Sequence, residues 1–87
     1  MASILLIDDS AMVRELIKEA IEPTHMFSRV FEAESGREGF EVLNRHDIDI
    51  VVCDLVMPGS SGYEFLELRR SVPSCAEVPT IILTSAE

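Results

Sequence analysis

Short apolar runs alternate with longer amphipathic stretches along the chain. Residues 3–7 form a continuous run that is typical of a strand buried on both faces. Residues 48–53 and 80–83 are mostly apolar, and the former are rich in β-branched side chains. Residues 27–33 are more polar, which favours a strand at the edge of a sheet. The pattern therefore predicts four strands.

The stretch after the first strand predicts a helix, for which the Asp8-Asp9-Ser10 segment supplies N-cap chemistry. Apolar residues follow at helical spacing, and we expect them to form the buried face: Val13, Leu16, Ile17, Ala20 and Ile21. Charged residues are expected on the other face: Arg14, Glu15, Lys18 and Glu19. Pro23 should end this helix.

Two further helices are predicted between the later strands. One opens at Ser35-Gly36 and carries Phe40 and Leu43, and Gly39 within it would permit close approach to the sheet. The other spans residues 62–70, although its apolar residues form no clean stripe. Pro73 and Pro79 are expected to bracket a loop.

The predicted order is βαβαβαβ, within one domain over residues 1–87. Strands that alternate with helices of this length imply crossover connections and a parallel sheet. The fold class is therefore α/β, with no repeat or linker in the chain.

Polar residues of unusual chemistry follow the ends of three predicted strands. Asp8 and Asp9 end the first strand, Asp54 ends the third, and Thr84 ends the fourth. Ligands of open α/β sheets bind outside the carboxyl ends of the strands. If these three strands are neighbours, three carboxylates and a hydroxyl share one small basin.

Three carboxylates this close repel one another and require protons, a cationic side chain or a metal. Mg2+ accepts one or two carboxylates, keeps several waters and also binds phosphate oxygens. A carboxylate can itself attack phosphorus and form an aspartyl-phosphate. Asp54 is the best candidate for this attack, because a tight Pro-Gly turn at Pro58 follows it. Each feature alone has an ordinary interpretation as a cap or turn, so the joint arrangement carries the prediction.

Composition excludes some functions. The net charge of −9 disfavours nucleic-acid binding and docking on anionic membranes. The chain begins without a basic region, and its first apolar run stops at Asp8, so we expect no signal peptide or membrane span. Cys53 and Cys75 lack metal or redox spacing and are expected to be reduced thiols of a cytoplasmic protein.

Several segments together resemble the receiver domain of bacterial response regulators. They are ILLIDDS at 4–10, EAESG at 32–36, VCDLVMPG at 52–59, Gly62 and PTIILT at 79–84. The resemblance implies a flavodoxin-like, doubly wound parallel sheet with strand order 2-1-3-4 over these residues. It also implies a phosphoryl-accepting module of a two-component system rather than an enzyme.

The resemblance implies a role for each site residue. Asp54 matches the aspartate that a sensor histidine kinase or phosphotransfer protein phosphorylates. Asp9 and Asp54 match direct ligands of Mg2+, Asp8 matches an acid that acts through metal-bound water, and Val56 would offer its backbone carbonyl. Thr84 matches the hydroxyl that contacts the phosphoryl group and transmits the switch to an effector domain or partner protein.

The chain departs from the receiver pattern at its end. Receivers continue with a further helix, a fifth strand ending in a Lys-Pro pair and a last helix, whereas this sequence stops at Glu87. We therefore expect an incomplete receiver that lacks the strand-five lysine. Its fourth strand should be an exposed edge through which the chain can self-associate.

Two other functions compete with the phosphoryl-accepting switch. A degenerate receiver would act only as an interaction or dimerisation piece, which the missing lysine favours and the intact aspartates oppose. A phosphohydrolase of the haloacid dehalogenase type also uses an aspartate nucleophile. That family needs a second aspartate two residues later, where this chain has Val56.

Overall fold

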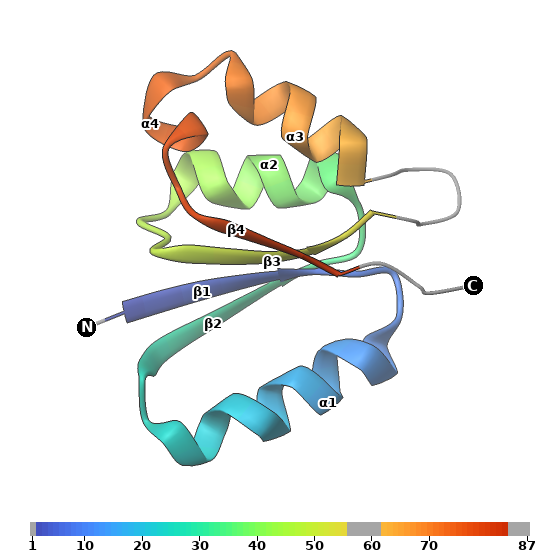
Figure 1. Ribbon diagram of the computed structural model, residues 1–87, viewed down its shortest axis with the longest axis vertical. Helices are drawn as coiled ribbons and strands as arrows, with labels where there is room; N and C mark the ends of the chain where they lie inside the picture. Colours follow the sequence, from blue (N-terminus) through green and yellow to red (C-terminus); the bar gives the residue numbers. More distant parts are fainter. Residues whose placement is uncertain (1, 56–61, 84–87) are drawn as a thin grey trace.

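The structure, a computed structural model, describes residues 2–55 and 62–83. Four parallel strands form one sheet in the order β2-β1-β3-β4 (Figure 1). Their bounds are β1 Ala2–Ile7, β2 Phe27–Ala33, β3 Ile50–Asp54 and β4 Thr80–Leu83. The predicted flavodoxin-like order and the parallel sheet are therefore confirmed. The third strand begins two residues later than predicted, and Ile48 is buried just before it.

Helices cover both faces of the sheet. Helix α1 (Ala11–Ile21) lies on one face, and α2 (Gly36–Arg45) and α3 (Gly62–Arg70) lie together on the other (Figure 1). Pro23 falls in a short 3-10 helix, η1 (Glu22–Thr24), directly after α1. The predicted loop after α3 is partly wrong, because Pro73–Ala76 forms a one-turn helix, α4. Proline suits the first turn of a helix, where its missing N–H leaves no hydrogen bond unmade.

Serine side chains cap the two longest helices. The hydroxyl oxygen of Ser10 accepts a hydrogen bond from the Val13 N–H at 3.2 Å, and α1 begins one residue later. Ser35 accepts from the Glu38 N–H at 3.1 Å and caps α2 in the same way. Both caps satisfy N–H groups that have no partner within the helix, so the helix starts follow from local sequence.

The strands bury alternate residues in two separate apolar clusters. Between the sheet and α2, α3 and α4 lie Leu5, Ile7, Ala33, Leu43, Ile48, Val51, Cys53, Phe65 and Cys75. Between the sheet and α1 lie Ile4, Leu6 and Val52, with Ile17, Ile21, Phe27 and Ile50 packed against them. Side chains of successive residues in a strand point to opposite faces, so one strand supplies both clusters.

Helix α1 differs from its prediction in which side chains it buries. Leu16 and Ala20, expected in the core, are exposed, and Leu16 exposes 58% of its surface. Arg14, expected in solvent, is only 8% exposed. The arginine is buried because its guanidinium finds hydrogen-bond partners beneath the helix, among them Glu32 of β2.

Candidate functional site

The neighbouring strands β1 and β3 bring three carboxylates together. Ile7 pairs with Cys53 in the sheet, so Asp8 and Asp54 follow at the same edge. One carboxylate oxygen from each of Asp8, Asp9 and Asp54 lies within 4.8 Å of the others. Asp8 is buried, Asp54 is half-buried and Asp9 is exposed. The prediction that these aspartates share one basin agrees with this geometry.

Asp8 is held by its backbone and its side chain. Its N–H donates to the carbonyl of Ala33 at 3.1 Å, and its Oδ1 accepts from the Ser10 N–H at 2.9 Å. Burial raises the pKa of the Asp8 carboxyl, and the charges of Asp54 and Asp9 raise it further, against the lowering effect of the Ser10 N–H. The raised pKa therefore reflects burial first and the neighbouring carboxylates second.

The backbone around Asp54 is clamped by close packing. A Cβ added to Gly62 would lie 2.4 Å from the Asp54 carbonyl oxygen and 2.9 Å from the Leu55 Cα, so only glycine fits there. The Gly62 N–H donates to the Leu55 carbonyl at 3.2 Å. The Leu55 N–H in turn donates to the Leu83 carbonyl at 3.2 Å. The start of α3 and the end of β4 therefore fix the segment that follows Asp54.

The donor set suits a hard divalent cation. All three side chains offer carboxylate oxygens, the ligands that Mg2+ prefers, and they lie close enough to share one ion. A cation here would also offset the burial cost and the mutual repulsion that together raise the pKa of Asp8. Val56, the turn at Pro58 and Thr84 lie outside the described residues, so their predicted roles stay predictions.

Two residues next to the cluster were missed by the sequence analysis. A terminal nitrogen of Arg14, Nη1, donates to the backbone carbonyl of Asp8, and Arg14 Nε donates to Glu32 Oε1 at 2.8 Å. The signal was present in the spacing, because Arg14 lies three and seven residues before Ile17 and Ile21, on one helical stripe. Arg14 was nevertheless expected in solvent, because its side chain is charged.

Cys53 is a potentially reactive side chain directly beside the acidic cluster, because it precedes Asp54 in β3. Burial, followed by the charges of Asp54 and Asp8, raises the pKa of the Cys53 thiol to about 11, so this cysteine stays a thiol. Both cysteines are free and buried. None of the helices in the described part of the chain could cross a membrane.

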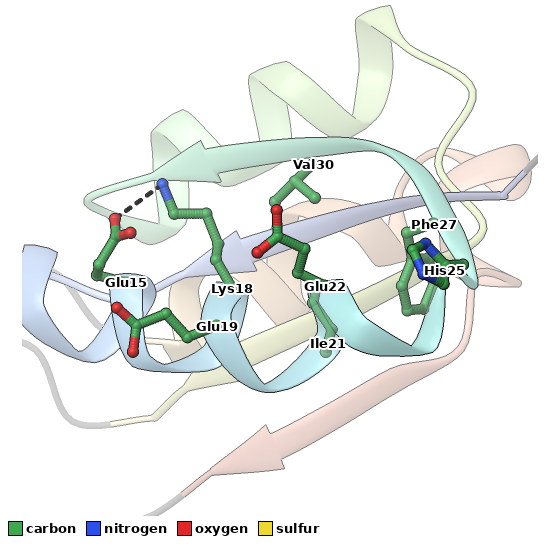
Figure 2. Close-up of a pocket in the computed structure, with 8 residues that line it drawn as sticks. All are labelled: Glu15, Lys18, Glu19, Ile21, Glu22, His25, Phe27 and Val30. Carbon is green, nitrogen blue, oxygen red and sulfur yellow. Dashed lines mark ion pairs between the residues drawn. The ribbon is translucent and has the colours of Figure 1, made fainter.

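A groove of about 450 Å³ lies between α1 and β2, and no aspartate of the acidic cluster lines it. Figure 2 shows its side chains, including the ion pair between Glu15 and Lys18. The lining residues are Glu15, Lys18, Glu19, Ile21, Glu22, His25, Phe27 and Val30. The groove and the carboxylate basin are therefore separate features of the molecule.

Residues 4–87 match the response regulator receiver domain family. The chain is 41% identical over 69 residues to the nitrate/nitrite response regulator protein NarL of Escherichia coli, covering 79% of this chain and 32% of that protein. It is 36% identical over 83 residues to a protein-glutamate methylesterase/protein-glutamine glutaminase of Treponema pallidum, covering 95% of this chain and 20% of that protein. The chain thus spans about a third and a fifth of these relatives.

Solved structures share the fold. The chemotaxis protein CheY4 of Vibrio cholerae superimposes with a TM-score of 0.88 at 26% identity, over 100% of this chain and 71% of that one. The N-terminal domain of a response regulator receiver protein from Methanoculleus marisnigri gives 0.86 at 31% identity, over 100% and 68%. Both similarities extend over the whole of this chain.

Proposed function

Because this chain belongs to the response regulator receiver domain family, we propose that it accepts a phosphoryl group on Asp54. The observation that supports this most directly is the grouping of Asp8, Asp9 and Asp54 within 4.8 Å at the ends of adjacent strands. An isolated aspartate would need no such neighbours. A cluster of this kind suits a carboxylate that receives a phosphoryl group beside a divalent cation.

The chemistry of the transfer belongs to Asp54. A carboxylate oxygen of Asp54 forms a bond to phosphorus while the bond from phosphorus to the donor atom breaks, and the donor leaves with that electron pair. The clamped backbone after Asp54 keeps this oxygen at the edge of the sheet, where a donor can approach. The module promotes only its own phosphorylation and dephosphorylation and turns over no other substrate.

We assign Mg2+ to the acidic cluster. Asp9 and Asp54 would bind it directly, Asp8 would act through a bound water, and the backbone carbonyl of Val56, outside the described residues, would be a further ligand. When bound, Mg2+ offsets charge on the phosphoryl oxygens. Burial keeps the Asp8 side chain in place for this role, since it exposes only 5% of its surface.

The partners follow from the same proposal. A sensor histidine kinase or phosphotransfer protein in the cytoplasm supplies the phosphoryl group. Thr84, outside the described residues, would contact the phosphoryl group through its hydroxyl, and an effector domain or partner protein would read the changed surface near β4. Within this scheme the transferred group adds roughly −1.5 to −2 charges at the edge of the sheet.

A second candidate function rests on β4. Among the described residues this strand lies at one edge of the sheet, and Ile81, Ile82 and Leu83 expose 37–48% of their surface. Exposed, apolar edge strands pair readily with other chains. The chain would then act as an interaction or dimerisation piece, with or without phosphorylation.

The test is incubation with Mg2+ and acetyl phosphate, followed by intact mass spectrometry. We expect one phosphoryl adduct per chain, stable in acid and labile in base, that is absent from Asp54→Ala. The matched control is Asp47→Asn, an exposed aspartate between α2 and β3, which should be phosphorylated as the parent chain is. A parent chain that stays unmodified would contradict the proposal and would favour the second candidate function, an interaction or dimerisation piece. Multiple turnover of the donor would instead indicate a hydrolase.

A further inference from the structure

Arg14 is unusual among the charged residues of α1. Its side chain exposes 10% of its surface, whereas the neighbouring Glu15 exposes 60%. A buried guanidinium is costly unless it is paired and hydrogen-bonded. Arg14 must therefore make contacts beneath the helix that offset this cost.

Its two described contacts lead to the acidic cluster and to strand β2. Arg14 Nη1 donates to the backbone carbonyl of Asp8, and Arg14 Nε donates to Glu32 Oε1 at 2.8 Å. The guanidinium is a planar fork, so holding one nitrogen on Glu32 directs the other toward Asp8. Glu32 thus orients the group that contacts Asp8.

Lys18 completes the network on the outside. Its Nζ lies 2.9 Å from Glu32 Oε2 and 3.1 Å from Glu15 Oε1. Figure 2 shows Lys18 reaching along α1 toward Glu15, on the wall of the groove. Lys18 therefore contacts Glu32 as Arg14 does, but none of its described hydrogen bonds or ion pairs involves the cluster.

The end of β2 holds both sides of Asp8. The Ala33 carbonyl accepts from the Asp8 N–H at 3.1 Å, and Glu32, one residue earlier, holds the arginine that binds the Asp8 carbonyl. The Asp8 carbonyl belongs to the peptide unit that joins Asp8 to Asp9, and that unit is planar. Fixing its oxygen fixes the plane from which the Asp9 side chain departs.

We propose that Arg14 is a positioning residue for the acidic cluster, and that Glu32 orients its guanidinium. Arg14 sets the Asp8–Asp9 peptide so that both carboxylates face one cation. This inference rests on the proposed Mg2+ site. Partners of metal ligands typically change metal affinity by about 10- to 100-fold when removed, and we expect the lower part of that range.

The sign of the effect separates positioning from simple electrostatics. Arg14 carries a positive charge, so removing it should tighten Mg2+ binding if charge alone mattered. If Arg14 positions the ligands, its removal should weaken binding. Lys18→Met is the matched control, because it makes the same change in net charge next to the same glutamate.

The experiment measures the Mg2+ dissociation constant by amide chemical shifts and, separately, unfolding by urea in EDTA. The variants are Arg14→Met, Arg14→Lys and Glu32→Gln, with Lys18→Met as the charge control. Ile48→Val serves as a stability control, because Ile48 is buried before β3, away from the end of the strand that carries Asp54. It should lower stability and leave Mg2+ affinity unchanged.

We expect Arg14→Met to bind Mg2+ about tenfold more weakly than Lys18→Met, with Arg14→Lys in between because an ammonium cannot reproduce the fork. Equal or tighter binding by Arg14→Met overturns the inference. If Arg14→Met does not fold in EDTA, the test uses Arg14→Lys and Glu32→Gln instead. The inference is then overturned if both variants bind Mg2+ as tightly as the parent chain. A parent chain that binds no Mg2+ overturns the proposed site and this inference together. A parent chain that binds Mg2+ without being phosphorylated overturns only the proposed function.

Discussion

The two faces of the sheet are built differently. The face toward α2, α3 and α4 buries nine residues in one apolar cluster, whereas the face toward α1 buries three. The α1 face adds ion pairs from Arg14 and Lys18 to Glu32. The described ion pair between α2 and α3, from Arg37 to Glu64, is more exposed than the Arg14–Glu32 pair. Apolar burial supplies most folding free energy, so the first face carries the greater share of stability. The second face orders the backbone beside the acidic cluster.

Adjacent residues of β1 offer the largest test of this difference. Leu5 and Leu6 are both fully buried on the same strand, but they point to opposite faces. Each Leu→Ala change should cost about 2–5 kcal/mol, and Leu5→Ala should cost more because more buried side chains surround the cavity that it leaves. Urea unfolding of both variants measures the two free energies. An equal cost, or a larger one at Leu6, would break the comparison.

Two helical glycines test how tightly the face toward α2 and α3 is packed. A Cβ at Gly62 would meet the Asp54 carbonyl at 2.4 Å, whereas a Cβ at Gly39 would meet the Ile7 side-chain end, Cδ1, at 2.3 Å. Backbone yields less than a side chain, so Gly62→Ala should cost about 1–3 kcal/mol. Gly39→Ala should cost less, since alanine recovers about 1 kcal/mol of helix propensity. Thermal unfolding of both variants is the measurement, and a reversed order would contradict the backbone clamp.

The ion pairs of the α1 face should respond to pH. The hydrogen bond from Lys18, and then that from Arg14, hold the pKa of Glu32 below its usual range in the folded chain. A lowered folded-state pKa contributes stability that is present at neutral pH and lost as pH falls through that pKa. Glu32→Gln should therefore destabilise the chain at pH 7 and do so less at pH 3. If the difference in free energy of unfolding between the parent chain and Glu32→Gln is the same at both pH values, the ion pairs do not have this role.

The smallest stability effect is expected at the β4 edge. Ile81 pairs in register with Val52 on the α1 face and exposes 48% of its surface. Ile81→Lys should change the free energy of unfolding by under about 0.5 kcal/mol, because the site is on the surface. It should still reduce self-association measured by light scattering, since an edge lysine opposes strand pairing. Leu16→Lys, which removes exposed apolar surface from α1, is the control and should leave association through β4 unchanged.

Much of the candidate site could be predicted because its signals are local. Asp8, Asp9 and Asp54 follow apolar runs directly, and a parallel sheet brings the ends of its strands to one edge. The segment after α3 was harder to predict from the sequence. Proline often ends a helix, but it can also begin one, as Pro73 does in α4.

The pattern of apolar runs, caps and strand-end aspartates was enough to establish the α/β order, the helix starts and the acidic basin. Those features depend on periodicity and on neighbours a few residues apart. The inward turn of Arg14 and the exposure of Leu16 required the folded molecule. Their environments depend on β2 and on the Asp8 carbonyl, and Glu32 lies 18 residues beyond Arg14 in the chain. A side chain's charge sets the cost of burying it, but only distant partners brought close by folding can offset that cost.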